Sequence, residues 1–314
     1  MNMHGLFTAL VTPFDSHDVV NEKSLVALLH HQLKGGVDGV VVCGSTGEGN
    51  NLEDFERDFV IKCAVRELKG KIPCVVGCGA PSTKQVVEYV KKAEQFGADG
   101  ILAVTPFYCR PTQEGIYLHF KALSDATRLP ICVYNIASRT GQNIETATLN
   151  RIAELPNIIG VKEASGNIAQ VQDVLEVVQH KKPHFIVTSG DDALALAHIS
   201  LGAKGLVSVI SNLLPKTTKR LVDEAMNCNI PIARALHFAL RPLFYGLFVE
   251  TNPIPLKRML EHVGFEMGPY RLPLCTPTKA NEEKIQHAIQ ACQHIIDDEF
   301  KEIEITKELL EQDW

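Results

Sequence analysis

The chain has 314 residues, of which 45% are hydrophobic and 22% charged, a composition typical of a globular protein with a large core. Its net charge of -6 gives no reason to expect a nucleic acid or an anionic membrane as partner. No run approaches the roughly 18 apolar residues of a membrane helix, and the first residues lack the basic start of a secretory signal. Nine cysteines, several of them inside apolar runs, favour reduced thiols and a cytoplasmic location. Cys74 and Cys78 lack a second Cys/His pair with ligand spacing, so we expect no metal site.

Eight apolar runs typical of buried strands follow one another along the first two thirds of the chain. They cover residues 6–14, 39–44, 72–79, 100–107, 130–136, 158–164, 184–190 and 205–211. Amphipathic helical sequence fills most of the gaps, most clearly at 52–70 and 83–97. Eight strands alternating with helices indicate a (β/α)8 barrel. A doubly wound open sheet is the alternative, but it usually has fewer strands and a recognisable nucleotide-binding motif.

A short glycine motif recurs as GGVDGV at 35–40, FGADGI at 96–101 and LGAKGL at 201–206. Each copy places one glycine where a helix ends and another where an apolar run begins. The motif therefore predicts a helix end, a tight turn and the start of a buried strand at three places.

The last third of the chain is helical in character. We expect helices at 215–227, 231–249, 253–263 and 281–297, followed by a charged helix or frayed tail over EFKEIEITKELLEQDW. This pattern predicts two domains: a barrel over 1–229 that holds the active site, and a C-terminal helical domain with the tail over 230–314.

Lys162 directly follows an apolar strand-like run, where an unpaired ammonium group costs several kcal/mol. One explanation is structural: the amine pairs with a carboxylate or reaches solvent. The other is chemical, because burial lowers the pKa of an amine and a neutral amine can form a Schiff base with a ketone. Glu163 should face away from Lys162, since neighbouring side chains of a strand alternate between its faces.

Other polar residues stand at the ends of neighbouring strands, where barrel enzymes place their active sites. Ser45 and Thr46 lie in the glycine-rich CGSTGEG, whose backbone N–H groups and hydroxyls suit a carboxylate or phosphate. Tyr108 lies in VTPFYCRP, and Tyr134 and Arg139 lie in VYNIASRTG. A flexible loop, rim tyrosines and a surface charge would explain each of these alone, but they explain the whole set poorly.

Seven motifs in order closely resemble the dihydrodipicolinate synthase family, a group of pyruvate-dependent lyases that includes N-acetylneuraminate lyase. They are TALVTPF, GSTGE, VTPFYCRP, VYNIASRTG, IIGVKEASGN, SGDDA and FVETNPIPLK. The resemblance runs from about residue 6 to about residue 291, and the tail from 300 to 314 falls outside it.

The resemblance implies a Schiff-base reaction between pyruvate and L-aspartate 4-semialdehyde that yields 4-hydroxy-tetrahydrodipicolinate, on the route to lysine and diaminopimelate. The implied catalytic residues are Lys162, Tyr134, Ser45 and Tyr108, and the implied substrate-binding residues are Thr46, Arg139, Val207 and Gly190. Lys162 would form the imine, and Arg139 would hold the carboxylate of the semialdehyde. No metal or organic cofactor is needed, because the iminium that Lys162 forms with pyruvate serves as the electron sink.

The resemblance also implies a homo-oligomer. Tyr108 would enter the active site of a neighbouring subunit in a tight dimer, and two dimers would form a tetramer.

Alternatives remain open at this point. Ser45 stands where many synthases carry threonine, and serine is also common in sialic acid lyases, so another pyruvate-dependent aldolase of N-acetylneuraminate or a keto-deoxy sugar acid is the second choice. Arg139 favours the synthase, because a cation suits a short aldehyde that bears a carboxylate. A barrel that has lost catalysis and serves as a sensor or scaffold is the third choice.

Feedback inhibition by lysine is expected to be weak or absent. The lysine-binding residues of inhibited relatives correspond here to Gly49, Asp54, Arg57, Pro81, Gln85 and Phe107. Most of these residues lack the polar groups of inhibited relatives, which tend to carry Ser, His, His, Asn, Glu and Tyr in that order.

Overall fold

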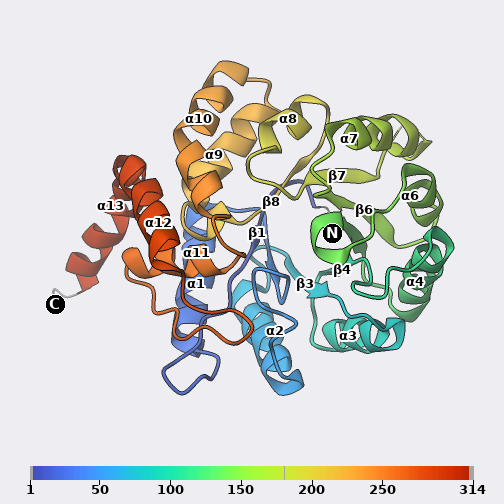
Figure 1. Ribbon diagram of the computed structural model, residues 1–314, viewed down its shortest axis with the longest axis horizontal. Coiled ribbons are helices and arrows are strands. Elements are labelled where there is room, and N and C mark those ends of the chain that lie inside the picture. The colour runs from blue at the N-terminus through green and yellow to red at the C-terminus, as the bar shows by residue number, and fades with distance from the viewer. Residues whose placement is uncertain (1–2, 180, 311–314) are drawn as a thin grey trace.

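Eight parallel strands close into a barrel in the order of the sequence, with β1 paired to β8 (Figure 1). The computed structural model describes residues 3–179 and 181–310. The strands are β1 (Gly5–Ala9), β2 (Gly39–Val42), β3 (Cys74–Cys78), β4 (Gly100–Val104), β5 (Ile131–Asn135), β6 (Ile158–Glu163), β7 (Ile186–Ser189) and β8 (Gly205–Ser208). Seven lie within their predicted runs and β1 begins one residue before its run, at Gly5, so the predicted barrel is confirmed and the open sheet is excluded.

Helices surround the barrel and follow its strands (Figure 1). They are α1 (Glu22–Gly35), α2 (Asp54–Leu68), α3 (Thr83–Gln95), α4 (Gln113–Ala126), α5 (Ala137–Thr140), α6 (Thr146–Ile152), α7 (Ile168–Val174), α8 (Ala195–Ser200) and α9 (Pro215–Met226). Short irregular turns, η1 (Leu175–Gln179) and η2 (Ile210–Asn212), extend α7 and precede α9. The two most clearly predicted helices are confirmed as α2 and α3.

The recurring glycine motif forms the predicted helix-to-strand turns. Gly36 has φ 73° between α1 and β2, Gly97 has φ 84° between α3 and β4, and Gly202 has φ 116° between α8 and β8. Residues other than glycine rarely adopt these φ angles, so each copy of the motif ends its helix at a defined residue. The following strand then begins three residues later in all three cases.

A register shift in β6 determines which of its side chains enter the barrel. The pairing with β5 moves from Ile131 opposite Ile158 to Cys132 opposite Gly160, which leaves one extra residue on β6. Ile159 packs against the inner cluster of the barrel, whereas Val161 belongs to the cluster between barrel and helices. Such a bulge changes the phase of the alternation and can re-aim a side chain. Lys162 consequently faces inward.

The C-terminal region is helical, as predicted, and packs beside α1 and α9 (Figure 1). It contains α10 (Ile230–Gly246), α11 (Ile254–His262), α12 (Lys279–Ala291) and α13 (Gln293–Leu310). The single helix expected at 281–297 is wrong, because the chain breaks at Cys292 into α12 and α13. The tail is helical up to Leu310, and residues 311–314 lie outside the described residues.

One apolar cluster extends from the barrel side of the helical layer into α10, α12 and α13, and includes Leu28, Leu240 and Ile285. The boundary between domains at 229 and 230 therefore stays a prediction.

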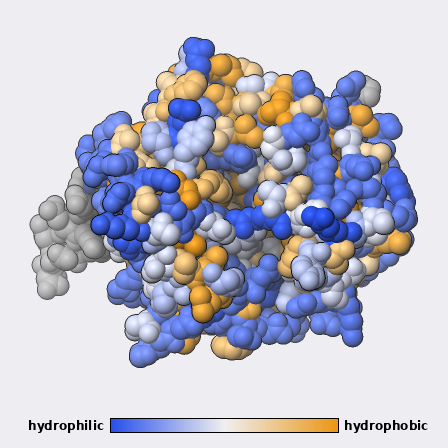
Figure 2. Space-filling model, in the orientation of Figure 1, coloured by the Kyte–Doolittle hydropathy of each residue, from blue (hydrophilic) through white to orange (hydrophobic). Residues whose placement is uncertain are grey.

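The surface is mostly hydrophilic on the face shown in Figure 2, with smaller apolar areas that include one over α10. Exposed apolar residues of this helix are Ile230, Ile232, Phe238 and Tyr245. Among the described residues, no helix combines the length and apolar character needed to cross a membrane.

Candidate active site

Lys162 lies inside the barrel, and only 5% of it is exposed. The pairing of β5 with β6 places Tyr134 directly beside it, and the Lys162 Nζ lies 4.2 Å from the centre of the Tyr134 ring. Within residues 3–179 and 181–310, Lys162 forms no ion pair, so neither a salt bridge nor access to solvent explains its position. Burial lowers the pKa of its amine from 10.5 to about 8, although the negative charge of Asp192 acts in the opposite direction.

This pKa predicts the pH dependence of imine formation. Imine formation requires the neutral amine, so the initial rate at which Lys162 would react with a small keto acid should rise about tenfold per pH unit up to about pH 8 and then level off. Borohydride trapping at short times between pH 6 and pH 10 would measure this rate. A midpoint at the ordinary lysine value of 10.5 would show that the amine is not perturbed by its surroundings.

Glu163 faces the opposite side of the strand from Lys162, as predicted. Its carboxylate accepts hydrogen bonds from Asn135 Nδ2 at 3.0 Å, Gln170 Nε2 at 3.1 Å and the Ser165 backbone N–H at 2.7 Å. These bonds satisfy a fully buried carboxylate between the barrel and α7. Glu163 is therefore a structural residue and has no contact with the amine.

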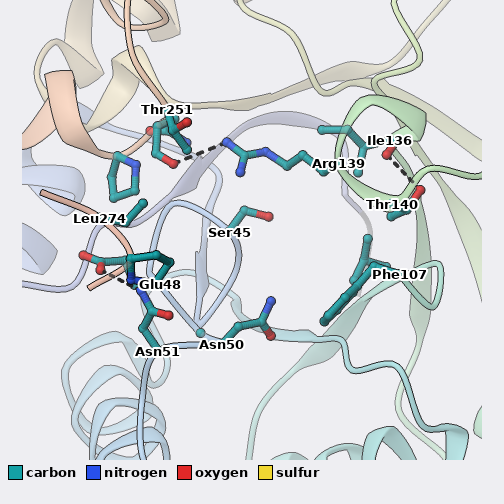
Figure 3. Close-up of a pocket in the computed structure, with 15 residues that line it drawn as sticks. Ser45, Glu48, Asn50, Asn51, Phe107, Ile136, Arg139, Thr140, Thr251 and Leu274 are labelled. Atoms are coloured by element: carbon teal, nitrogen blue, oxygen red, sulfur yellow. Dashed lines mark hydrogen bonds between the residues drawn. The ribbon is translucent and has the colours of Figure 1, made fainter. Parts of the chain in front are cut away.

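A cavity of about 240 Å³ opens among the segments that follow β2, β4 and β5 (Figure 3). Ser45 and Asn50, from the loop after β2, and Arg139, from α5, point into it, and Thr251 lines it from the C-terminal region. A smaller cavity of about 30 Å³ shares Ser45 with the first and is also lined by Tyr134. Ser45 thus connects the wider cavity to the tyrosine that contacts Lys162.

Tyr134 lies in β5 and Arg139 lies five residues later in α5, but Tyr134 is buried and Arg139 is exposed. Burial raises the pKa of the Tyr134 hydroxyl to about 12, although the charge of Arg139 lowers it, so the hydroxyl carries its proton at neutral pH. Arg139 is exposed, and its Nη2 donates a hydrogen bond to the Asn252 carbonyl at 3.3 Å (Figure 3). Its guanidinium group keeps donors free to bind an anion in the cavity.

The loop that carries Ser45 and Thr46 is held tightly by other segments. The Thr12 hydroxyl donates to the Gly47 carbonyl at 2.7 Å, and Asn252 Nδ2 donates to Thr46 Oγ1 at 2.9 Å. Glu48 forms an ion pair with Lys257 of α11 at 2.5 Å, with both side chains buried. Glu48 also has φ 52°, a conformation that costs energy outside glycine and persists only where the surroundings enforce it.

Two further predicted residues lie at the same end of the barrel. Val207 of β8 is 1% exposed and belongs to the inner cluster that also contains Tyr134. Gly190 follows β7, and a Cβ atom there would lie 2.7 Å from Lys162 Cε. Only glycine leaves room at this position for the lysine side chain.

Tyr108 is the one predicted site residue that the fold does not bring to the others. It is 91% exposed, has φ 71° and lines neither of the two cavities. A large aromatic side chain held outward in a strained conformation is consistent with a partner surface, but not with a role in its own subunit's site.

The sequence profile of the dihydrodipicolinate synthetase family matches residues 2–292. The chain belongs to this family.

Individual relatives cover nearly the whole chain. The 4-hydroxy-tetrahydrodipicolinate synthase of Protochlamydia amoebophila is 47% identical over 285 residues, which are 91% of this chain and 95% of that protein. The solved structure of the chloride-inhibited dihydrodipicolinate synthase of Acinetobacter baumannii, complexed with pyruvate, is 36% identical. It has a TM-score of 0.90 and covers 93% of this chain and 99% of that chain. The enzyme of Cyanidioschyzon merolae, solved with lysine bound, is also 36% identical, with a TM-score of 0.89 over 93% of this chain and 99% of that chain.

Asp192 acts electrostatically on Lys162 and was not predicted from the sequence, although it lies in SGDDA, one of the motifs shared with the dihydrodipicolinate synthetase family. Its buried carboxylate accepts hydrogen bonds from the Ser208 hydroxyl at 2.5 Å and the Val209 N–H at 2.9 Å. Burial raises its pKa to about 6, despite these bonds. The hydrogen bonds of Asp192 fix the end of β8. Among the charges that raise the pKa of Lys162, the carboxylate of Asp192 has the largest effect.

Asn252 and Lys257 were also missed, because they lie about 200 residues from the loop they contact. The signal that could have found them is their place in FVETNPIPLK, one of the motifs shared with the family.

All nine cysteines lie in the described part of the chain and are free, and Cys43, Cys74 and Cys132 are buried as expected. Among the described residues, no group of three or more His, Cys, Asp or Glu side chains is placed to hold a metal ion.

Proposed function

We propose that the chain condenses pyruvate with L-aspartate 4-semialdehyde through an imine on Lys162. Its activity is that of a 4-hydroxy-tetrahydrodipicolinate synthase, a lyase on the route to lysine and diaminopimelate. The observation that carries the mechanism is a buried, unpaired lysine with a lowered pKa, packed on a tyrosine next to a cavity that contains an arginine. The aldolase of sugar acids is not favoured, because the relatives that cover nearly the whole chain are named as this synthase.

The reaction begins when the neutral Lys162 amine adds to the ketone carbon of pyruvate. Loss of water from this adduct gives the imine, and removal of a proton from the methyl group gives the enamine. The enamine carbon adds to the aldehyde carbon of the second substrate, whose amino group then displaces Lys162 and closes the ring. Tyr134 relays protons in these steps, because its hydroxyl is protonated and its ring contacts the amine.

Separate groups serve the two substrates. Ser45 and Thr46 hold the pyruvate carboxylate, and Val207 and Gly190 shape the space around the imine. Arg139 binds the carboxylate of the semialdehyde at the mouth of the cavity, where a guanidinium group can bind both carboxylate oxygens.

The active unit is a homodimer in this proposal, and two dimers form a tetramer. Tyr108 of each subunit enters the partner's site and completes a hydroxyl chain with Tyr134 and Ser45. Its exposure of 91% in the single chain supports this role. The nine free cysteines support a reducing, cytoplasmic location.

Product assays test the function directly. Pyruvate with L-aspartate 4-semialdehyde should give the cyclised product, whereas pyruvate with N-acetylmannosamine should give no N-acetylneuraminate. The reverse pattern would assign the chain to the sugar acid aldolases.

Lysine is expected to inhibit the enzyme weakly or not at all. The Arg57 guanidinium is buried, donates to the Gly77 carbonyl and packs 4.3 Å from the Tyr89 ring centre, so a cation lies at one of the positions that correspond to the lysine-binding residues of inhibited relatives. Gln85 is bonded to the Tyr89 hydroxyl at 2.7 Å. Initial rates at saturating substrates should stay nearly unchanged in sub-millimolar lysine. Loss of most of the activity in that range would contradict this prediction.

A further inference from the structure

The C-terminal region reaches the Ser45–Thr46 loop through two buried side chains. Asn252 precedes α11, is 4% exposed and donates from Nδ2 to Thr46 Oγ1 at 2.9 Å. Lys257 of α11 is 0% exposed and pairs with Glu48 at 2.5 Å. Thr46 and Glu48 are thus both held from the same short segment, more than 200 residues further along the chain.

The direction of the Asn252 bond determines what the Thr46 hydroxyl can do. A threonine hydroxyl has one hydrogen to donate and two lone pairs that accept. Because the Asn252 amide donates, Thr46 Oγ1 is the acceptor, and its own hydrogen remains for another acceptor. A carboxylate offers only acceptors, so a hydroxyl in this state is prepared to bind one.

We propose that Asn252 is a positioning residue for the keto-acid substrate: it directs the Thr46 hydroxyl so that this hydroxyl donates to the substrate carboxylate. The inference rests on the proposed function, in which Thr46 binds pyruvate. Asn252 also contacts the other half of the site, because its backbone carbonyl accepts from Arg139 Nη2 at 3.3 Å. Substitution of the Asn252 side chain leaves this backbone carbonyl in place. The KM for pyruvate should therefore change, and the KM for L-aspartate 4-semialdehyde should not.

Asn252→Ala tests this difference. The KM for pyruvate should rise roughly tenfold, as expected for loss of one directing hydrogen bond, while the KM for L-aspartate 4-semialdehyde stays unchanged. Introduced into a Thr46→Val background, the same substitution should have no further effect on the KM for pyruvate, since Asn252 acts through the hydroxyl. Equal increases in both KM values, or an undiminished effect without the hydroxyl, would overturn the proposal.

Asn252→Asp provides a second test with a side chain of the same size. A carboxylate can only accept from the Thr46 hydroxyl, so the bond reverses and the hydrogen is no longer available to pyruvate. The KM for pyruvate should rise at least as much as in Asn252→Ala. An aspartate variant with normal pyruvate kinetics would overturn the proposal, even if the alanine variant does not fold.

Wild-type protein treated with pyruvate and borohydride separates the two hypotheses. If it gains no adduct, the proposed function fails and this inference fails with it. If it gains the adduct but both Asn252 variants bind pyruvate normally, the function stands and only the role of Asn252 is wrong.

Discussion

Lys162→Met is expected to abolish turnover while the barrel stays folded. Methionine matches the lysine stem in length and lacks the amine, so no imine can form. Loss of a covalent nucleophile should lower kcat by at least about 10³-fold. Steady-state product formation measures this loss, and borohydride trapping should show no pyruvate adduct on the variant.

The same substitution should stabilise the fold at neutral pH. The pKa of Lys162 is lowered from 10.5 to about 8 in the folded state, so between these values the unfolded chain binds more protons. Stability therefore rises with pH across that window, and below about pH 8 the cost of the buried ammonium is fully present. Removing the amine should raise the free energy of unfolding at pH 7 by up to about 3 kcal/mol, less the lost contact with the Tyr134 ring.

Lys69→Met is the matched control, because Lys69 is exposed beyond the end of α2. It should leave both turnover and stability unchanged. A Lys162→Met variant that retains substantial turnover, or one that unfolds at room temperature, would contradict the role assigned to the amine.

Arg139→Gln is expected to lower kcat/KM for L-aspartate 4-semialdehyde and to leave imine formation with pyruvate nearly unchanged. The guanidinium lines the cavity and has one hydrogen bond, at 3.3 Å, within the part of the chain that the structure describes, so its other donors can bind the semialdehyde carboxylate. Losing a charge-assisted bond to a carboxylate should lower kcat/KM for the semialdehyde by about 10²-fold. Imine formation with pyruvate should proceed at nearly the wild-type rate.

Arg151→Gln is a suitable control, since Arg151 pairs with Glu114 on the outer helices and lies away from the cavity. It should change neither substrate's kinetics. If Arg139→Gln instead blocks the pyruvate adduct, or leaves the semialdehyde kinetics intact, Arg139 does not bind the second substrate.

Most of the fold could be predicted from the sequence because its signals are local. Each strand is a continuous apolar run, and a glycine turn at three places marks where a helix stops. The break at Cys292 was not predictable in this way, since the helical pattern continues through it. The inward orientation of Lys162 depends on the bulge at Ile159, which becomes visible only when β6 is paired with β5.

The site was predicted less completely than the fold. Residues at strand ends, such as Ser45 and Arg139, could be assigned because a barrel brings those ends together. Asn252 and Lys257 could not, because their contacts with Thr46 and Glu48 join segments that only the folded chain brings near each other. Tyr108 stays a prediction that depends on a second subunit.

The central claim is that Lys162 is the nucleophile of this enzyme, and one measurement tests it most directly. Wild-type protein is incubated with pyruvate and borohydride, and the modified residue is located by mass spectrometry of peptides. We expect a single reduced pyruvate adduct, on Lys162, which L-aspartate 4-semialdehyde diminishes by turning the enamine over. No adduct, or an adduct on another lysine, would contradict the account.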